Sequence, residues 1–120
     1  MGLTYVTVEL SALGSADSTY STEFLVDTGA TDTLAPASAL RAAGLTPAGR
    51  TSYELADGRV EEFDFGLAKI SFMGEVTAGR VIFGPDTAAP LLGVTALESV
   101  GILVDPANKS LRRLPAIPLK

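Results

Sequence analysis

The chain has 120 residues, of which nine are basic and fourteen acidic, and it contains neither cysteine nor histidine. These absences exclude thiol nucleophiles, Ser-His triads, disulfides and zinc sites built on thiolate or imidazole. The net charge of −5 disfavours a nucleic-acid partner, and no apolar stretch is long enough to span a membrane.

The length predicts one domain over residues 1–120. Glycine and proline recur at regular intervals, which is typical of short strands joined by turns. The strands are expected at 3–10, 20–26, 51–55, 59–65, 66–72, 75–83, 103–105 and 110–114. A short helix is expected over Pro36–Ala43, ending at Gly44. Thr95 and Glu98 form a capping-box pattern for a second helix that ends at Gly101. The fold class is therefore mainly β, with two short helices.

One aspartate stands out by its position. Asp27 follows the apolar run Phe24–Val26, at the point where a buried strand is expected to end. Two such carboxylates held together share one proton, because like charges about 3 Å apart cannot both ionise. The pair can then deprotonate a water while protonating a peptide carbonyl. The alternative is that Asp27 only satisfies the amides of its own turn.

The segment Phe24–Ala30, with Asp27-Thr28-Gly29-Ala30 at its end, resembles the active-site motif of the retropepsin-like aspartic proteases. Leu91-Leu92-Gly93 before a short helix resembles their second signature, and 91–114 resembles the end of small bacterial members. The resemblance implies a closed retropepsin-like β-barrel, the acid protease fold, with a flap hairpin over the substrate. It makes Asp27 catalytic and gives Thr28, Gly29 and Ala30 supporting roles.

The same resemblance places the flap tip, and with it substrate binding, at Asp57, Gly58 and Arg59. An ordinary Asp-Gly hairpin turn is the alternative. Asp32 is a candidate substrate contact, since Thr31 stands near the position where many viral members carry an aspartate; the alternative is a solvated or helix-preceding cap. Ala30 has no hydroxyl to bond the outer carboxylate oxygen, so we expect a working pH less acidic than that of pepsin.

The chain carries one Asp-Thr-Gly sequence, and Gly93 follows Leu92 directly, so there is no second aspartate in an equivalent turn. A dyad therefore needs Asp27 from each of two chains, which makes a homodimer the expected state. The tail 115–120 is expected to be either part of the dimer interface or disordered.

The preferred hypothesis is a homodimeric aspartic endopeptidase that cleaves peptides bound in an extended conformation. The alternative is a non-catalytic peptide-binding or dimerisation module on the same fold. Neither hypothesis calls for a metal or cofactor. No secretory signal is recognisable at the N-terminus, so a cytoplasmic location is expected.

Overall fold

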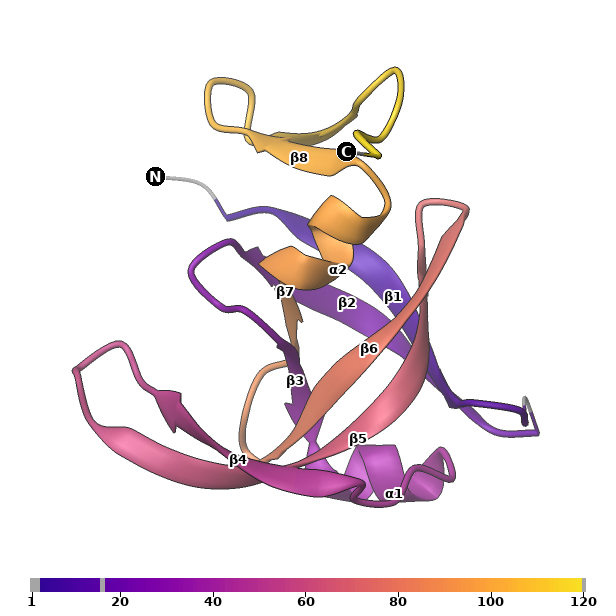
Figure 1. Cartoon of the computed structure of the whole chain (residues 1–120), viewed down its shortest axis with the longest axis vertical. Helices are drawn as coiled ribbons and strands as arrows, with labels where there is room; N and C mark the ends of the chain where they lie inside the picture. The colour runs from indigo at the N-terminus through magenta and orange to yellow at the C-terminus, as the bar shows by residue number, and fades with distance from the viewer. Residues whose placement is uncertain (1–2, 16, 120) are drawn as a thin grey trace.

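The computed structural model describes residues 3–15 and 17–119. Strands dominate it, and two helices of six residues each interrupt them (Figure 1). In chain order the elements are β1 (Tyr5–Ala12), β2 (Thr19–Asp27), β3 (Thr33–Pro36), α1 (Ala37–Ala42), β4 (Gly49–Glu54), β5 (Val60–Phe72), β6 (Glu75–Gly84), β7 (Leu91–Gly93), α2 (Val94–Ser99), β8 (Ile102–Asp105) and β9 (Ser110–Arg113). In the described part of the chain, no helix is long and apolar enough to cross a membrane.

The main sheet closes into a barrel. Its strand order is β1-β2-β7-β3-β6-β5-β4, and β1 also pairs with β5 from Glu9↔Ser71 to Ala12↔Ala68. The ring therefore runs through β1, β2, β7, β3, β6 and β5, while β4 continues from β5 outside it as one strand of a projecting hairpin (Figure 1). The predicted mainly β, closed barrel is confirmed.

The hydrophobic core is mostly aliphatic, as the composition indicates. Its buried apolar side chains are Val8, Leu10, Phe24, Ala35, Leu40, Ala43, Leu45, Ala68, Ile70, Phe72, Val81, Ile82, Phe83, Leu92, Ala96, Leu97 and Ile102. Leu40 of α1 and Leu97 of α2 are among them, so each short helix is held by one apolar face on the strands. Such packing is required, because helices of this length are unstable alone in water.

Two local predictions were wrong, and one strand was missed. The strands expected at 59–65 and 66–72 form one strand, β5, because Gly66 is packed rather than turned: a Cβ there would lie 3.1 Å from Phe83 and from the Thr46 carbonyl. Strand β3 was not predicted, since it has four residues and runs directly into α1. The capping box at Thr95 and Glu98 is not used either, because α2 begins at Val94 and its N-cap, Gly93, makes no side-chain cap bond.

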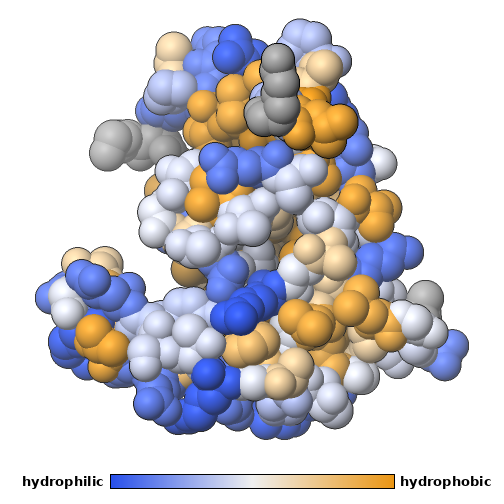
Figure 2. All heavy atoms as spheres, in the orientation of Figure 1, coloured by the Kyte–Doolittle hydropathy of each residue, from blue (hydrophilic) through white to orange (hydrophobic). Residues whose placement is uncertain are grey.

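The C-terminal part forms a second, two-stranded sheet of β8 and β9. Leu114 N donates to Gly101 O at 2.8 Å, which turns the tail back towards α2. Thr4 Oγ1 donates to Lys109 O at 3.1 Å, so the first described residues lie against this sheet (Figure 1). Apolar side chains are gathered there on the face seen in Figure 2, and Ile117 and Leu119 are exposed. A dimer role for 115–120 stays a prediction, and Lys120 lies outside the described residues.

Candidate active site

Asp27 is the last residue of β2, and a loop of five residues leads from it to β3. Strand β7 lies between these two strands: it pairs in parallel with β2, bringing Asp27 opposite Gly93, and antiparallel with β3 at Leu34↔Leu91. The strands that enter and leave the loop are thus held apart by the width of one strand. This arrangement fixes the position of Asp27 at one edge of the barrel.

Gly93 fits against the loop itself. A Cβ at this position would lie 2.5 Å from the carbonyl carbon of Asp32 and 2.8 Å from Thr31 O. The Gly93 amide donates to Thr33 Oγ1 at 3.1 Å, and the Thr33 side chain is buried. Any residue larger than glycine at position 93 would displace the backbone of the Asp27 loop. This explains the glycine in the second signature, Leu91-Leu92-Gly93.

Helix α2 is capped by the loop instead of by a side chain. Val94 N donates to Ala30 O at 2.8 Å, and Thr95 N donates to Thr31 O at 3.2 Å. Because these amides at the helix start already have partners, the Thr95 hydroxyl is not needed as a cap. The bonds also tie the loop to α2.

The Asp27 carboxylate is half-buried and is oriented by its own turn. Gly29 N donates to Asp27 Oδ1 at 3.0 Å, and Ala30 N donates to Asp27 O at 3.1 Å. A Cβ on Gly29 would lie 3.3 Å from that same Oδ1, so a side chain here would press on the carboxylate. Thr28 and Gly29 are exposed in the single chain.

A cleft of about 680 Å³ opens in front of Asp27. Its floor comes from the loop, its roof from the β4–β5 hairpin and its inner wall from barrel side chains. It is lined by Asp27, Gly29, Ala30, Thr31, Asp32, Leu34, Ser52, Tyr53, Glu54, Leu55, Ala56, Phe63, Ile82 and Leu91. In Figure 2 it is a hollow between the hairpin arm and the barrel.

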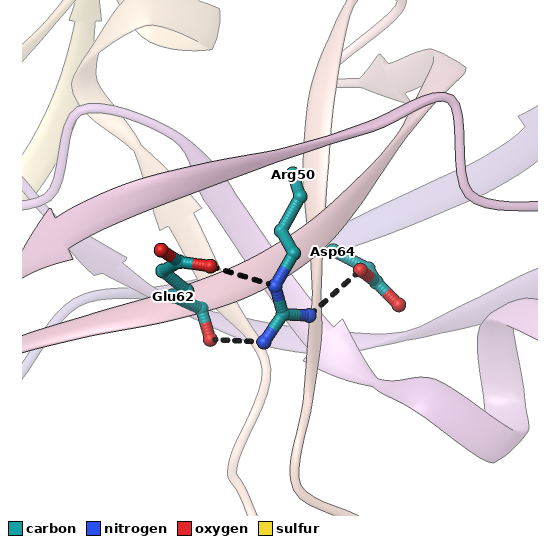
Figure 3. Close-up of polar contacts among 3 residues, drawn as sticks. All are labelled: Arg50, Glu62 and Asp64. Carbon is teal, nitrogen blue, oxygen red and sulfur yellow. Dashed lines mark hydrogen bonds and ion pairs between the residues drawn. The ribbon is translucent and has the colours of Figure 1, made fainter.

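Exposed ion pairs link the two strands of the hairpin. Arg50 pairs through Nε with Glu62 Oε1 at 3.0 Å and through a terminal nitrogen with Asp64 Oδ1 at 2.9 Å (Figure 3). At the tip, Asp57 and Arg59 pair with each other at 2.7 Å, and Gly58 has a φ of +88°. Gly58 thus supplies the left-handed conformation that the turn requires.

The structure places the expected site residues in two groups, apart from Thr28, which is exposed and does not line the cleft. Asp27, Gly29, Ala30 and Asp32 line the cleft. Asp57, Gly58 and Arg59 form the hairpin tip, beyond the hairpin residues that line the cleft of the single chain, so their contact with substrate stays a prediction. Among the described residues, no acidic cluster is arranged to hold a metal ion.

Sequence reasoning missed Tyr53. Its hydroxyl donates to Asp32 Oδ2 at 2.7 Å, which links the roof of the cleft to the floor. Burial, and secondly the bond to Asp32, raise the pKa of Tyr53, so its phenol stays protonated at neutral pH. The available signal was strand alternation, since Thr51, Tyr53 and Leu55 share one face of the hairpin.

Comparisons with known proteins report on the family and on the fold of the chain. The family model described as "gag-polyprotein putative aspartyl protease" matches residues 15–99. No curated protein sequence matches the chain.

Among solved structures, the retroviral protease-like domain of Ddi1 from Leishmania major is similar, with 14% identity, coverage of 96% of this chain and 92% of that one, and a TM-score of 0.54. Lpg0085 from Legionella pneumophila, of unknown function, has 19% identity, coverage of 87% and 92%, and a TM-score of 0.53. A retropepsin-like aspartic protease from Rickettsia conorii has 21% identity, coverage of 88% and 94%, and a TM-score of 0.48.

At these low sequence identities the solved structures show only that the fold is shared, whereas the family model assigns the chain to a family. Because that model matches residues 15–99 of the 120, the chain belongs to the gag-polyprotein aspartyl protease family, and its fold is that of the retropepsin-like aspartic proteases.

Proposed function

We propose that this chain is a homodimeric aspartic endopeptidase in which Asp27 of each protomer supplies one of the two catalytic carboxylates. The observation that carries the proposal is the Asp27 carboxylate on the floor of a roofed cleft, in a member of an aspartyl protease family. With Gly93 opposite Asp27 in β7, the same chain has no aspartate in register to act as partner.

The chemistry follows from two carboxylates that share one proton. The ionised carboxylate takes a proton from a water molecule while the water oxygen attacks the peptide carbonyl carbon. The protonated carboxyl group gives its proton to the carbonyl oxygen. The carboxyl that took the proton of the water then gives it to the amide nitrogen of the tetrahedral intermediate, while the other carboxylate takes a proton from one of the intermediate's hydroxyls. The C–N bond breaks, and an acid and an amine leave.

Residues that are exposed in the single chain support dimerisation. Thr28 and Gly29, directly after Asp27, are exposed. A two-fold axis beside this turn would bring the same residues of both protomers into contact, as an isologous interface requires. The exposed apolar residues Leu3, Tyr5, Ile117 and Leu119 offer further surface for such a contact.

The cleft also suggests the kind of substrate. Its volume falls within the ~300–1,000 Å³ that is typical of ligand pockets. Leu34, Phe63, Ile82 and Leu91 give it an apolar wall. An extended peptide with apolar side chains near the cleaved bond would match that wall, with the hairpin closing over its main chain.

The deciding experiment compares wild type with Asp27→Asn on a diverse peptide library. The change keeps the shape of the side chain and removes its acid/base function, so hydrolysis should fall by at least about 10²–10⁴-fold. Asp17→Asn, a conservative change in the β1–β2 turn, is the matched control and should retain activity. Equal hydrolysis by wild type and Asp27→Asn would refute the mechanism.

The dimer is tested separately. Sedimentation should show a concentration-dependent monomer–dimer equilibrium, and specific activity should rise with the dimer fraction. An inhibitor with a statine-type hydroxyl, which mimics the tetrahedral intermediate, should stabilise the dimer and block cleavage. A chain that binds peptides without cleaving them would instead support the non-catalytic peptide-binding module.

A further inference from the structure

One hydrogen bond spans the cleft from floor to roof. Its acceptor is the carboxylate of Asp32, five residues after Asp27 in the same loop, and its donor is the hydroxyl of Tyr53 in β4. The two oxygens lie 2.7 Å apart, and the bond is partly buried. A peptide lying between loop and hairpin has to share this space with the bond.

The Asp32–Tyr53 bond lies between the main cleft and a second, smaller cavity. Asp32 lines the main cleft, and it also lines a cavity of about 20 Å³, room for about one water, together with Thr33, Arg80 and Thr95. Tyr53 lines the main cleft but not this small cavity. The Asp32–Tyr53 bond therefore closes the main cleft from floor to roof at the place where the cleft borders this small cavity.

The hairpin strand β4 has a second polar tie to the barrel. Arg80 of β6 donates to Thr51 Oγ1 at 3.2 Å, and its guanidinium lies over the ring of Phe65 at 4.1 Å. The Tyr53 ring lies 6.3 Å from the Phe63 ring, so it remains packed if its hydroxyl is removed. We therefore expect that removing the hydroxyl alone breaks the tie between floor and roof and leaves the hairpin folded.

We propose that the Asp32–Tyr53 bond tethers the β4–β5 hairpin to the floor of the cleft. It would thereby set the length of peptide that the cleft of each protomer, its half of the substrate groove, accepts. A bound chain that reaches past this bond has to displace the Tyr53 hydroxyl from Asp32, whereas a shorter one leaves the bond intact. Asp32 and Tyr53 are then specificity-determining residues for substrate length. This inference rests on the proposed function, because it concerns the groove in which that peptide would lie.

The test uses a nested set of probes: a statine-centred peptide with none to three alanine residues added at both ends. Binding is measured by calorimetry to wild type, Tyr53→Phe and Asp32→Ala. The shortest probe should bind all three proteins equally. The longest probe should bind both variants about tenfold more tightly than wild type, the factor that one hydrogen bond of ~1.4 kcal/mol represents.

The matched control is Tyr20→Phe, which removes a hydroxyl from a tyrosine packed on Phe24 outside the cleft. It should behave as wild type with every probe. The double variant Tyr53→Phe/Asp32→Ala should add nothing to either single change, because both remove the same bond. A gain that is equal at every probe length, or that Tyr20→Phe shares, would overturn the inference.

Amide hydrogen exchange without any probe separates the two hypotheses. Tyr53→Phe should speed exchange in the hairpin over residues 49–65, and Tyr20→Phe should not. If no probe binds wild type but exchange changes as expected, the proposed function fails and the tether stands. If exchange in the hairpin is unchanged, the tether fails, whatever the enzyme cleaves.

Discussion

The tightest constraint on the active site is at Gly93, and it yields a quantitative prediction for Gly93→Ala. The new Cβ would lie 2.5 Å from Asp32 C and 2.6 Å from Asp32 O, whereas ordinary contact begins at 3.4 Å. The loop backbone or β7 therefore has to move by 3.4 − 2.5 = 0.9 Å. Both neighbours are backbone atoms, so no side-chain rotation can relieve the clash.

Two consequences follow from that displacement. Overpacking of this kind costs about 1–3 kcal/mol of folding free energy. A displacement near 1 Å in the Asp27 loop can lower kcat/KM by about 10²-fold, because catalytic carboxylates act only in correct geometry. The assays are urea unfolding for stability and peptide hydrolysis for activity, at protein concentrations high enough for the proposed dimer to form fully.

Gly79→Ala is the matched control for this change. Gly79 lies in β6, and a Cβ there would meet Ile70 at 3.8 Å, which is ordinary contact. It should change stability little and leave hydrolysis intact. If Gly93→Ala is as stable and as active as Gly79→Ala, the packing of β7 against the loop does not position Asp27.

Three further changes test the frame around the site. The Ser38 amide donates to the Asp86 carboxylate and holds its pKa below the usual 3.8, so this bond stabilises the fold above that pH. The contribution is lost as the pH falls through the lowered pKa. In urea unfolding, Asp86→Asn should therefore have a lower free energy of unfolding than wild type at neutral pH, and the difference should vanish in acid. Gly101 has a φ of +71°, and a Cβ there would lie 2.8 Å from Ile117, so Gly101→Ala should cost ~1–2 kcal/mol in thermal unfolding, part of which Ile117→Ala restores. Arg50→Gln removes exposed ion pairs (Figure 3), so its stability loss should be small and should disappear at high salt; a loss that persists in salt would contradict this.

The parts of the site that could be predicted from the sequence are those carried by contiguous residues. Asp27-Thr28-Gly29 after an apolar run specifies a turn, and a turn depends on its own residues. The hairpin at Asp57-Gly58 is predictable for the same reason, because the glycine takes the positive φ that its turn requires. The expectation of two protomers also needs only the sequence, because a dyad takes two carboxylates and the chain has one such aspartate.

The parts that could not be predicted are contacts between distant segments. Nothing in Leu91-Leu92-Gly93 says that β7 lies between β2 and β3, and without that topology the steric role of Gly93 is invisible. The capping box failed for the same reason, since loop carbonyls from 30 and 31 replaced the side-chain cap. Asp32 and Tyr53 are 21 positions apart, and their bond depends on how far the hairpin curves over the loop.

The floor and the roof of the cleft are therefore held in different ways. The loop is fixed by backbone bonds to α2 and by steric fit against Gly93, both of which are part of the folded barrel. Beyond its strand pairing, the hairpin is held by side-chain bonds from Tyr53 and Arg80, which can break without unfolding anything. Substitutions that disturb these backbone contacts of the floor should thus reduce stability and catalysis together, whereas substitutions that break the side-chain bonds to the roof should change which peptides bind and leave stability nearly unchanged. A site built this way can alter its specificity through β4 while the Asp27 turn stays constant.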